Sequence, residues 1–227
     1  MGKSHPALGD TLHGIGAIII SIDLFDQNDN ALKFLRRALA IRAASNGNEH
    51  IKVSQTMMII AQIHFRKGEF EQAIRHIEKA LQIQRVLYGP DDTRMADSLN
   101  MLAEARLKRS EDKDYTVATS CFREVARIRE LNNGMKDEAT LLTLKRVASL
   151  FATNGEYDEA LTLYENILPF FRSAMDDSIQ FVAMSSRQID VAQCTGSVLN
   201  EMGIVKTRIR RNDDAYGYFK EALGVNS

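Results

Sequence analysis

The stretch AQIHFRKGEFEQAIRHIEKALQI, residues 61–83, decides the fold of this chain. It begins inside one helical pattern of apolar residues and ends inside a second, and Gly68 between them is a natural end for the first helix. Ala61 and Ala73 hold corresponding places in the two patterns. Because small side chains let two helix backbones approach closely, the stretch predicts a hairpin of two packed helices.

The same pair of small residues recurs five times in 227 residues, and its second members are 42, 45, 42 and 55 residues apart. Each pair predicts one hairpin, and a hairpin that cannot bury its apolar face alone stacks on its neighbours. The chain is therefore predicted to be an all-α solenoid of five antiparallel helical hairpins. The pairs are Gly16 with Ala31, Ala61 with Ala73, Ala103 with Ala118, Ala148 with Ala160, and Gly203 with Ala215.

We expect one repeat domain, in which the hairpin turns within residues 25–30 and 110–115 are longer than the others. Pro169 is expected to end or kink its helix. The inserted stretch 177–189 contains neither Pro nor Gly, so it is expected to be helical, either extending a neighbouring helix or standing alone. The predicted bounds are 5–47 for repeat 1, 48–90 for repeat 2, 91–134 for repeat 3, 135–176 for repeat 4, and 177–227 for the insertion with repeat 5.

Composition narrows the class of function. The net charge is −1, which argues against general binding to nucleic acid or to membrane surfaces, because both need an excess of Lys and Arg. The apolar run Ile15–Ile22 is too short to span a bilayer and predicts a buried first helix. Cys121 and Cys194 are too few for a disulfide framework and are expected to be small buried residues. A cytoplasmic location is expected.

The repeats resemble a known family. The spacing Ala61–Ala73–Ile77–Ala80–Leu81 is similar to that of the tetratricopeptide repeat, and the 42-residue period resembles the kinesin light chain repeats. The resemblance implies a right-handed superhelix that binds other proteins. Val125 and Ile167 replace the last small residue of repeats 3 and 4, and the paired asparagines of the kinesin family are reduced to Asn100 and Asn200. Further matching segments are His5-Pro6, residues 38–42, Tyr88–Asp92 and Leu99–Ala103.

No arrangement of residues in the sequence indicates catalysis or cofactor binding. The five histidines form no His-Glu-x-x-His motif, and no Cys-x-x-Cys, Gly-x-Ser-x-Gly or Gly-x-Gly-x-x-Gly occurs. His64 holds an aromatic position of its repeat and is expected to pack there, and His50 precedes a helix. We therefore expect no metal, no cofactor and no enzymatic activity.

The concave side of the stack is the candidate binding surface, and the first helix of each repeat lines it. Positions three before, one after, and four to five after the small residue face this groove. Asn and Gln side chains there can pair with a peptide backbone, and basic groups can receive acidic side chains. The alternative is that they are solvent-exposed helix residues only. The predicted peptide-binding residues are His13, Met58, Gln62, Arg66, Asn100, Glu104, Lys108, Lys145, Ser149, Asn200 and Arg208, and the same count also gives Ala17, Ser21, Phe65, Leu107, Thr153 and Ile204.

Three functions fit this sequence. The first is a non-catalytic scaffold that binds a peptide segment of a partner protein in the groove. The second is a regulatory module excised from a larger protein, such as a nucleotide switch or a motor adaptor. The third is a structural protein that self-associates through its uncapped ends, because terminal repeats need a polar outer face. We expect a protein or peptide partner, with no nucleic acid and no membrane.

Overall fold

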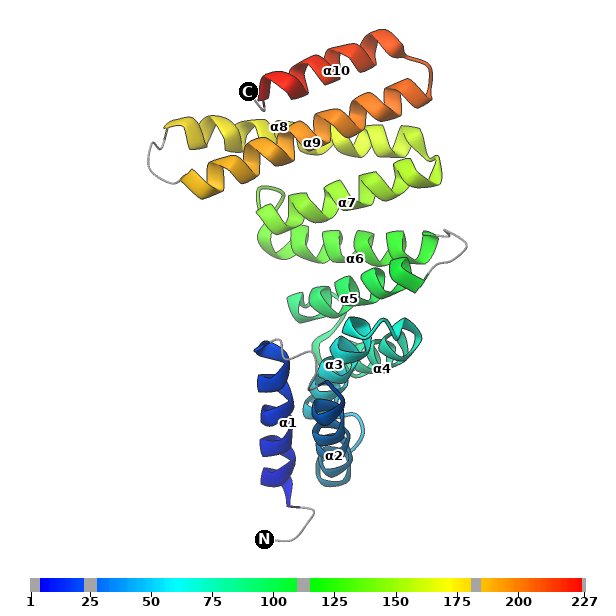
Figure 1. Ribbon diagram of the computed structural model, residues 1–227, viewed down its shortest axis with the longest axis vertical. Coiled ribbons are helices and arrows are strands. Elements are labelled where there is room, and N and C mark those ends of the chain that lie inside the picture. Colours follow the sequence, from blue (N-terminus) through cyan, green and yellow to red (C-terminus); the bar gives the residue numbers. More distant parts are fainter. Residues whose placement is uncertain (1–4, 23–27, 110–114, 181–184, 226–227) are drawn as a thin grey trace. The chain divides into compact units, whose positions relative to one another are not determined.

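The computed structural model describes residues 5–22, 28–109, 115–180 and 185–225, without the side chains of residues 175–191. These ranges form ten α-helices and contain no strand, so the predicted all-α class is confirmed. The helices are α1 (Pro6–Ser21), α2 (Asn28–Asn46), α3 (Ile51–Arg66), α4 (Phe70–Tyr88), α5 (Thr93–Arg109), α6 (Thr116–Asn133), α7 (Glu138–Asn154), α8 (Tyr157–Gln180), α9 (Ser185–Arg208) and α10 (Asn212–Val225) (Figure 1).

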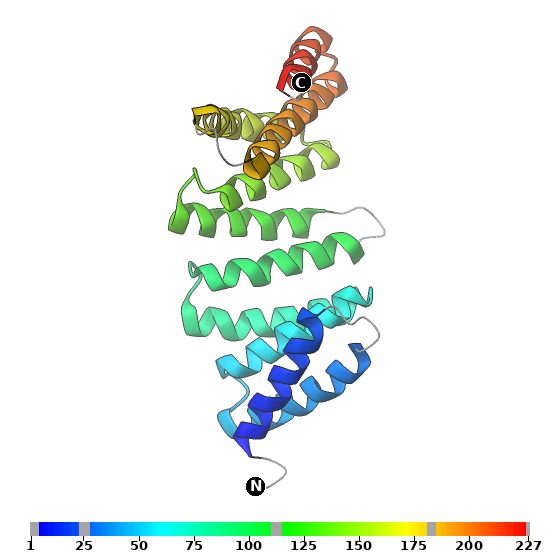
Figure 2. The same cartoon turned by 60° about the vertical axis from the view of Figure 1, so that its left-hand side comes forward.

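The helices gather into two compact units, residues 1–128 and 129–227. In the first unit, α1 packs on α2, α2 on α3, α3 on α4, and α4 on α5. In the second unit, α7 packs on α8, α8 on α9, and α9 on α10. The pair α9 and α10 lies side by side in both views (Figures 1 and 2). Within each unit these consecutive helices are thus neighbours, as a series of hairpins requires.

The hairpin turns follow local chemistry. Gly68 and Gly155 have φ values of +76° and +85°, in the left-handed region that favours glycine, and they end α3 and α7 as predicted. The His50 side chain accepts a hydrogen bond from the backbone N–H of Lys52 and caps α3. Asp92 caps α5 in the same way, because its Oδ1 accepts from the backbone N–H of Arg94 at 2.9 Å.

Close approach of paired helices is the common feature of the repeats. A Cβ atom added to Gly16 would lie 2.5 Å from Cγ of Leu35 on α2, and one added to Gly203 would lie 2.6 Å from Cε1 of Phe219 on α10. These distances leave no room for a methyl group. The eight alanines of the repeated pairs are at most 3% exposed: Ala31, Ala61, Ala73, Ala103, Ala118, Ala148, Ala160 and Ala215. The small residues therefore mark the helix contacts, as the repeat pattern predicts.

A stacked pair of histidines lies between α3 and α4. His64 is 4% exposed, its Nδ1 lies 2.5 Å from Oε2 of Glu69, and its ring stacks on His76 with centroids 5.7 Å apart. The packing role predicted for His64 is confirmed. The Nδ1 atom of His76 is buried without a hydrogen-bond partner among the described residues. Burial, together with the nearby charges of His64, Lys79 and Arg36, lowers the pKa of His76 to about 4.

Two expectations drawn from the sequence are wrong in part. Of the two outcomes expected at Pro169, an end of the helix is wrong: Pro169 lies inside α8, because the buried neighbours Leu168 and Phe171 hold the helix in its packed position while the proline ring is exposed. A kink at Pro169 stays a prediction. The apolar run of α1 is only partly buried: Ile20 is 5% exposed, but Ile18 is 60% exposed. Helical periodicity identifies an apolar face, but it does not show whether a neighbour covers that face.

Other expectations have mixed outcomes. The inserted stretch lengthens both neighbouring helices, since α8 runs to Gln180 and α9 begins at Ser185, each with 24 residues. Cys121 and Cys194 are half-buried free thiols. Of the two longer hairpin turns, residues 23–27 and 110–114 lie outside the described residues, whereas residues 28–30 belong to the first turn of α2.

Two glycines of α1 give a matched test of the close approach. We expect Gly16→Ala to destabilise the chain by about 1–3 kcal/mol, because Leu35 is fully buried and cannot move away from the new methyl group. Gly14→Ala should be neutral or stabilising by up to about 1 kcal/mol, because nothing lies within 4 Å of its Cβ and alanine favours the helix. Urea denaturation measures both, and equal effects would contradict the close approach.

The depressed pKa of His76 predicts how stability depends on pH. Between the ordinary pKa of 6.5 and the folded value of about 4, the unfolded chain binds a proton that the folded chain does not. The free energy of unfolding therefore falls as the pH is lowered through this window. We expect His76→Gln to reduce this loss, as measured by urea denaturation of both proteins at several pH values. Parallel pH profiles would contradict the prediction.

Candidate functional site

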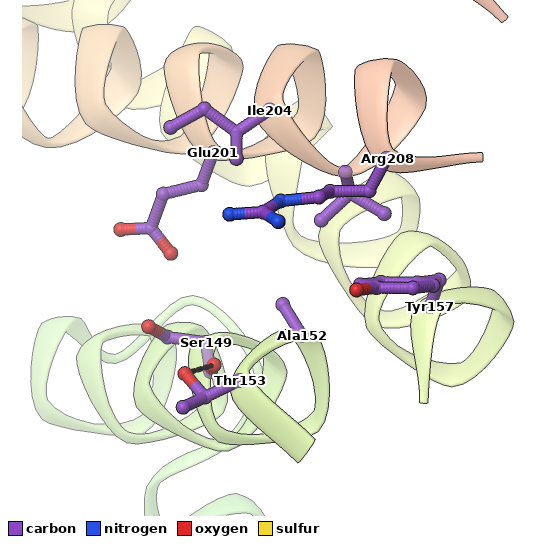
Figure 3. A pocket seen from close by; sticks show the side chains of 8 residues that line it. Ser149, Ala152, Thr153, Tyr157, Glu201, Ile204 and Arg208 are labelled. Atoms are coloured by element: carbon purple, nitrogen blue, oxygen red, sulfur yellow. Dashed lines mark hydrogen bonds between the residues drawn. The ribbon is translucent and has the colours of Figure 1, made fainter. Parts of the chain in front are cut away.

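A pocket of about 400 Å³ opens between α7, α8 and α9 in the second unit (Figure 3). Hydroxyl groups of α7 line one side of the pocket, and a carboxylate and a guanidinium group of α9 line another. Aliphatic and aromatic side chains form the rest of its wall. The lining residues are Ser149, Ala152, Thr153, Tyr157, Glu201, Ile204, Val205 and Arg208.

Helical spacing brings these side chains together. Ser149 and Thr153 are four residues apart on α7, so they lie on one face, and the Thr153 hydroxyl donates to the carbonyl of Ser149 at 2.8 Å. On α9, Glu201, Ile204 and Arg208 follow at steps of three and four residues. In Figure 3 the side chains of α7 and of α9 face one another across the pocket.

Tyr157 reaches the pocket because of a tight turn. It is the first residue of α8, two residues after Gly155, whose left-handed conformation reverses the chain. The backbone N–H of Glu156 donates to the carbonyl of Phe151 at 2.9 Å and closes this turn. The Tyr157 ring is therefore held at the edge of the pocket by backbone geometry.

The carboxylate of Glu201 is fixed by a group below the pocket. The hydroxyl of the fully buried Tyr164 donates to Oε2 of Glu201, and the hydroxyl of Ser197 lies 3.4 Å from Oε1. Burial and this hydrogen bond raise the pKa of Tyr164, so the phenol keeps its proton and remains a donor. Glu201 thus presents an oriented acceptor to the pocket.

Arg208 is the cation of the pocket. Its side chain is exposed, and within the described part of the chain it forms no hydrogen bond or ion pair. Figure 3 shows its guanidinium group extending along α9 in the direction of Glu201. An arginine in this position can donate to a carboxylate or carbonyl of a bound molecule.

The structure brings part of the predicted groove into this pocket. Ser149 and Arg208 line it, together with Thr153 and Ile204 from the same counting rule. Lys145 is half-buried on α7 and Asn200 is exposed on α9, and neither lines the pocket.

Four lining residues, Ala152, Tyr157, Glu201 and Val205, were missed in the sequence, and two of them carry polar groups. Glu201 precedes Ile204 by three residues and Arg208 by seven, so the helical spacing of the counted residues would have included it. Tyr157 belongs to a second helix, and only the turn at Gly155 brings it to the pocket.

In the first unit, three predicted residues have partners inside the fold. Nδ1 of His13 lies 3.3 Å from Oγ1 of Thr56, and its half-buried position lowers its pKa. The guanidinium of Arg66 donates to the carbonyl of Ile20 at 3.0 Å. Met58 packs against the core between α3, α4 and α5.

The other predicted residues of the first unit lie on α3 and α5. Gln62, Asn100 and Glu104 are half-buried, and Lys108 is exposed. One hollow of this unit is formed by α4 and α5, and it contains none of the predicted residues. Its lining is Glu78, Leu81, Gln82, Arg85, Leu99 and Leu102.

The described residues offer no site for a metal ion, since no three His, Cys, Asp or Glu side chains cluster among them. Within the same ranges, none of the helices is both long enough and apolar enough to cross a membrane.

Comparison with known proteins identifies the repeats. Residues 52–114 match the tetratricopeptide repeat model. The chain is 24% identical over 211 residues to Protein KINESIN LIGHT CHAIN-RELATED 1 of Arabidopsis thaliana. The aligned region covers 92% of this chain but 31% of that relative. The chain thus spans less than a third of the relative's length.

Solved structures show the same fold. The chain matches nearly identical TPR-like repeats from a protein described as a kinesin light chain of Podosopora anserina, with a TM-score of 0.68, 16% identity, and coverage of 97% of this chain and 96% of that one. It also matches YrrB, described as a TPR protein with an unusual peptide-binding site, with a TM-score of 0.60, 16% identity, and coverage of 94% and 84%. The resemblance to kinesin light chain-like tetratricopeptide repeats is confirmed.

The hydrogen bond beneath the pocket predicts a difference between two tyrosines. We expect Tyr164→Phe to lower the free energy of unfolding by about 1–2 kcal/mol, because the Glu201 carboxylate loses its buried donor. Tyr218→Phe is the control: Tyr218 is half-buried, and no hydrogen bond of its hydroxyl is found among the described residues. Thermal denaturation of both variants tests this. Equal losses would mean that the Tyr164 hydroxyl contributes nothing.

Proposed function

We propose that this chain is a non-catalytic scaffold that binds a peptide segment of a partner protein in the groove lined by the first helices of its repeats. The pocket between α7 and α9 carries the proposal, because it gathers Ser149, Thr153, Ile204 and Arg208 from two successive first helices. These are the positions that the repeat count assigns to the groove.

The lining suits a peptide. The hydroxyls of Ser149 and Thr153 can hydrogen-bond to a peptide backbone, and the unpaired guanidinium of Arg208 can receive an acidic side chain. Ile204 is 45% exposed and, with the Tyr157 ring, offers apolar surface to a neighbouring side chain of the peptide. Since the helices are held rigidly by their packing, the chain needs little reordering to bind.

The similar proteins support the class of function. The matched family model describes a repeat, and one structural neighbour is named for its peptide-binding site. These similarities support peptide binding by the present chain only through analogy of fold. The hypothesis about where the peptide binds comes from the pocket residues.

A second candidate is a regulatory or adaptor module of a longer protein. One observation favours it: the chain spans only 31% of the length of its kinesin light chain-related relative. In that case the groove would bind a peptide as proposed, and the effect of binding would be produced by the rest of the protein.

Two threonines give a matched test of the pocket. Thr153 lines the pocket and Thr162 is exposed on α8, and each hydroxyl donates to the carbonyl four residues earlier at 2.8 Å. Peptides are first selected from a random peptide display library on the wild-type chain, and their affinities are measured by fluorescence anisotropy. We expect Thr153→Arg to weaken binding at least about tenfold by filling the pocket, and Thr162→Arg to leave it unchanged.

Two results would overturn the proposal. If the library yields no peptide that binds the wild-type chain, the scaffold function is unsupported. If the selected peptides bind both variants as tightly as the wild type, the pocket between α7 and α9 is not the binding site. Circular dichroism spectra of the two variants show whether both remain folded.

A further inference from the structure

Three second helices, α2, α4 and α8, carry an apolar pair that the next helix covers, whereas the same positions on α6 hold Thr119 and Ala126. The pair lies one and eight residues after the small residue, and the next helix packs on it in the same core cluster. On α4 the pair is Ile74 and Leu81, at 2% and 9% exposure, and on α8 it is Leu161 and Leu168, at 7% and 4%. On α2 the pair is Leu32, which is buried, and Leu39, which is half-buried.

The first helices α3, α5 and α9 carry the complementary pair. It lies one residue before and two residues after the small residue, and it packs against the preceding hairpin. The members are at most 8% exposed on three helices: Ile60 and Ile63 on α3, Leu102 and Ala105 on α5, and Met202 and Val205 on α9. The two pairs together form the contact between successive repeats.

The residues at the positions of both pairs are exposed on α10 and on α1. On α10 the positions of Ile74 and Leu81 are taken by Tyr216 and Leu223, which are 70% and 74% exposed. On α1 the positions before and after Gly16 are taken by Ile15 and Ile18, which are 37% and 60% exposed. Leu223, Ile15 and Ile18 are aliphatic like the covered pairs, Tyr216 is aromatic, and the exposure of all four is reversed.

We propose that this chain binds a second copy of itself head to tail, with α10 of one copy packed on α1 of the next. The contact would continue the one between α4 and α5 or between α8 and α9, with the same register positions on each side. A second copy is the proposed occupant because it carries, at the same register positions, the kind of side chain that covers each of these pairs inside the fold.

Charge does not oppose this contact at α1. The described part of α1 contains one carboxylate, Asp10, and it is already paired with Arg42 at 2.8 Å and Lys52 at 2.9 Å. The pairing lowers the pKa of Asp10, so the carboxylate stays ionised within its ion pairs. The apolar face at Ile15 and Ile18 can therefore be covered without burying an unpaired charge.

A head-to-tail contact differs from a two-fold dimer in what it builds. It joins two different faces, so every added copy leaves one face of each kind exposed, and the assembly grows with concentration unless it closes into a ring. The proposal goes beyond the peptide-binding function and is independent of it, because neither Ile18 nor Leu223 lines the pocket.

Two charge substitutions separate the possibilities. Ile18→Glu spoils the α1 face and Leu223→Glu spoils the α10 face, while Val86→Glu, at a residue that is 79% exposed on α4, is the control. Sedimentation velocity is run on the 227-residue chain from micromolar to millimolar concentration. We expect wild type and Val86→Glu to form concentration-dependent oligomers, and each end variant alone to associate at least about tenfold more weakly.

Mixing the two end variants is the decisive measurement. Ile18→Glu retains its α10 face and Leu223→Glu retains its α1 face, so the mixture should form a dimer through one intact contact and grow no further. A wild-type chain that stays monomeric throughout would overturn the proposal. An end variant that associates as strongly as wild type would also overturn it, because the contact would then join like faces. A mixture of the two end variants that stays monomeric would overturn it as well. Matching circular dichroism spectra establish that the variants are folded.

Discussion

The close contact of two helices at a residue without a bulky side chain determines the arrangement of every hairpin. Leu35 lies over Gly16 and Phe219 lies over Gly203, at distances that exclude a methyl group. Such contacts fix the rotation of each helix about its axis, since only one face is small enough to approach the partner. Once the rotation is fixed, the faces for the next hairpin and for solvent follow from the helical period. The pocket residues on α7 and α9 are consequences of this constraint.

The pocket also depends on a polar contact that the repeat does not require. Tyr164 occupies a core position of α8 that is aliphatic in α4, where Ile77 takes its place, yet it carries a hydroxyl that must be satisfied when buried. Glu201 accepts its hydrogen bond and is thereby oriented at the pocket wall. Because the buried Tyr164 hydroxyl needs a hydrogen-bond acceptor, the Glu201 carboxylate is held in a fixed orientation at the pocket wall. Arg208, which lines the same pocket, stays available to a ligand.

Local rules predicted the features that depend on a few neighbouring residues. The glycine ends of α3 and α7 and the buried alanines follow from backbone conformation and spacing, which the sequence displays directly. A helix end at Pro169 was wrongly expected, because packing by residues on either side holds α8 together. Glu201 was missed because it lies two residues before Gly203, outside the counted positions, although it shares the helical spacing of Ile204 and Arg208. Ile18 was wrongly expected to be buried. The helical period of apolar residues is the same whether or not another helix covers the apolar face.

The exposed outer faces bear on stability as well as on association. In a stack of repeats, most of the stability of a hairpin comes from its contacts with the hairpins on both sides. Among the described residues, the hairpin of α1 and α2 contacts α3 within its unit, and the hairpin of α9 and α10 contacts α7 and α8. A second copy on either face would add the missing neighbour and would stabilise the hairpin it covers. Binding of an α10 face should therefore slow hydrogen exchange in α1 more than in α4, and uniform protection would argue that the covered surface lies elsewhere.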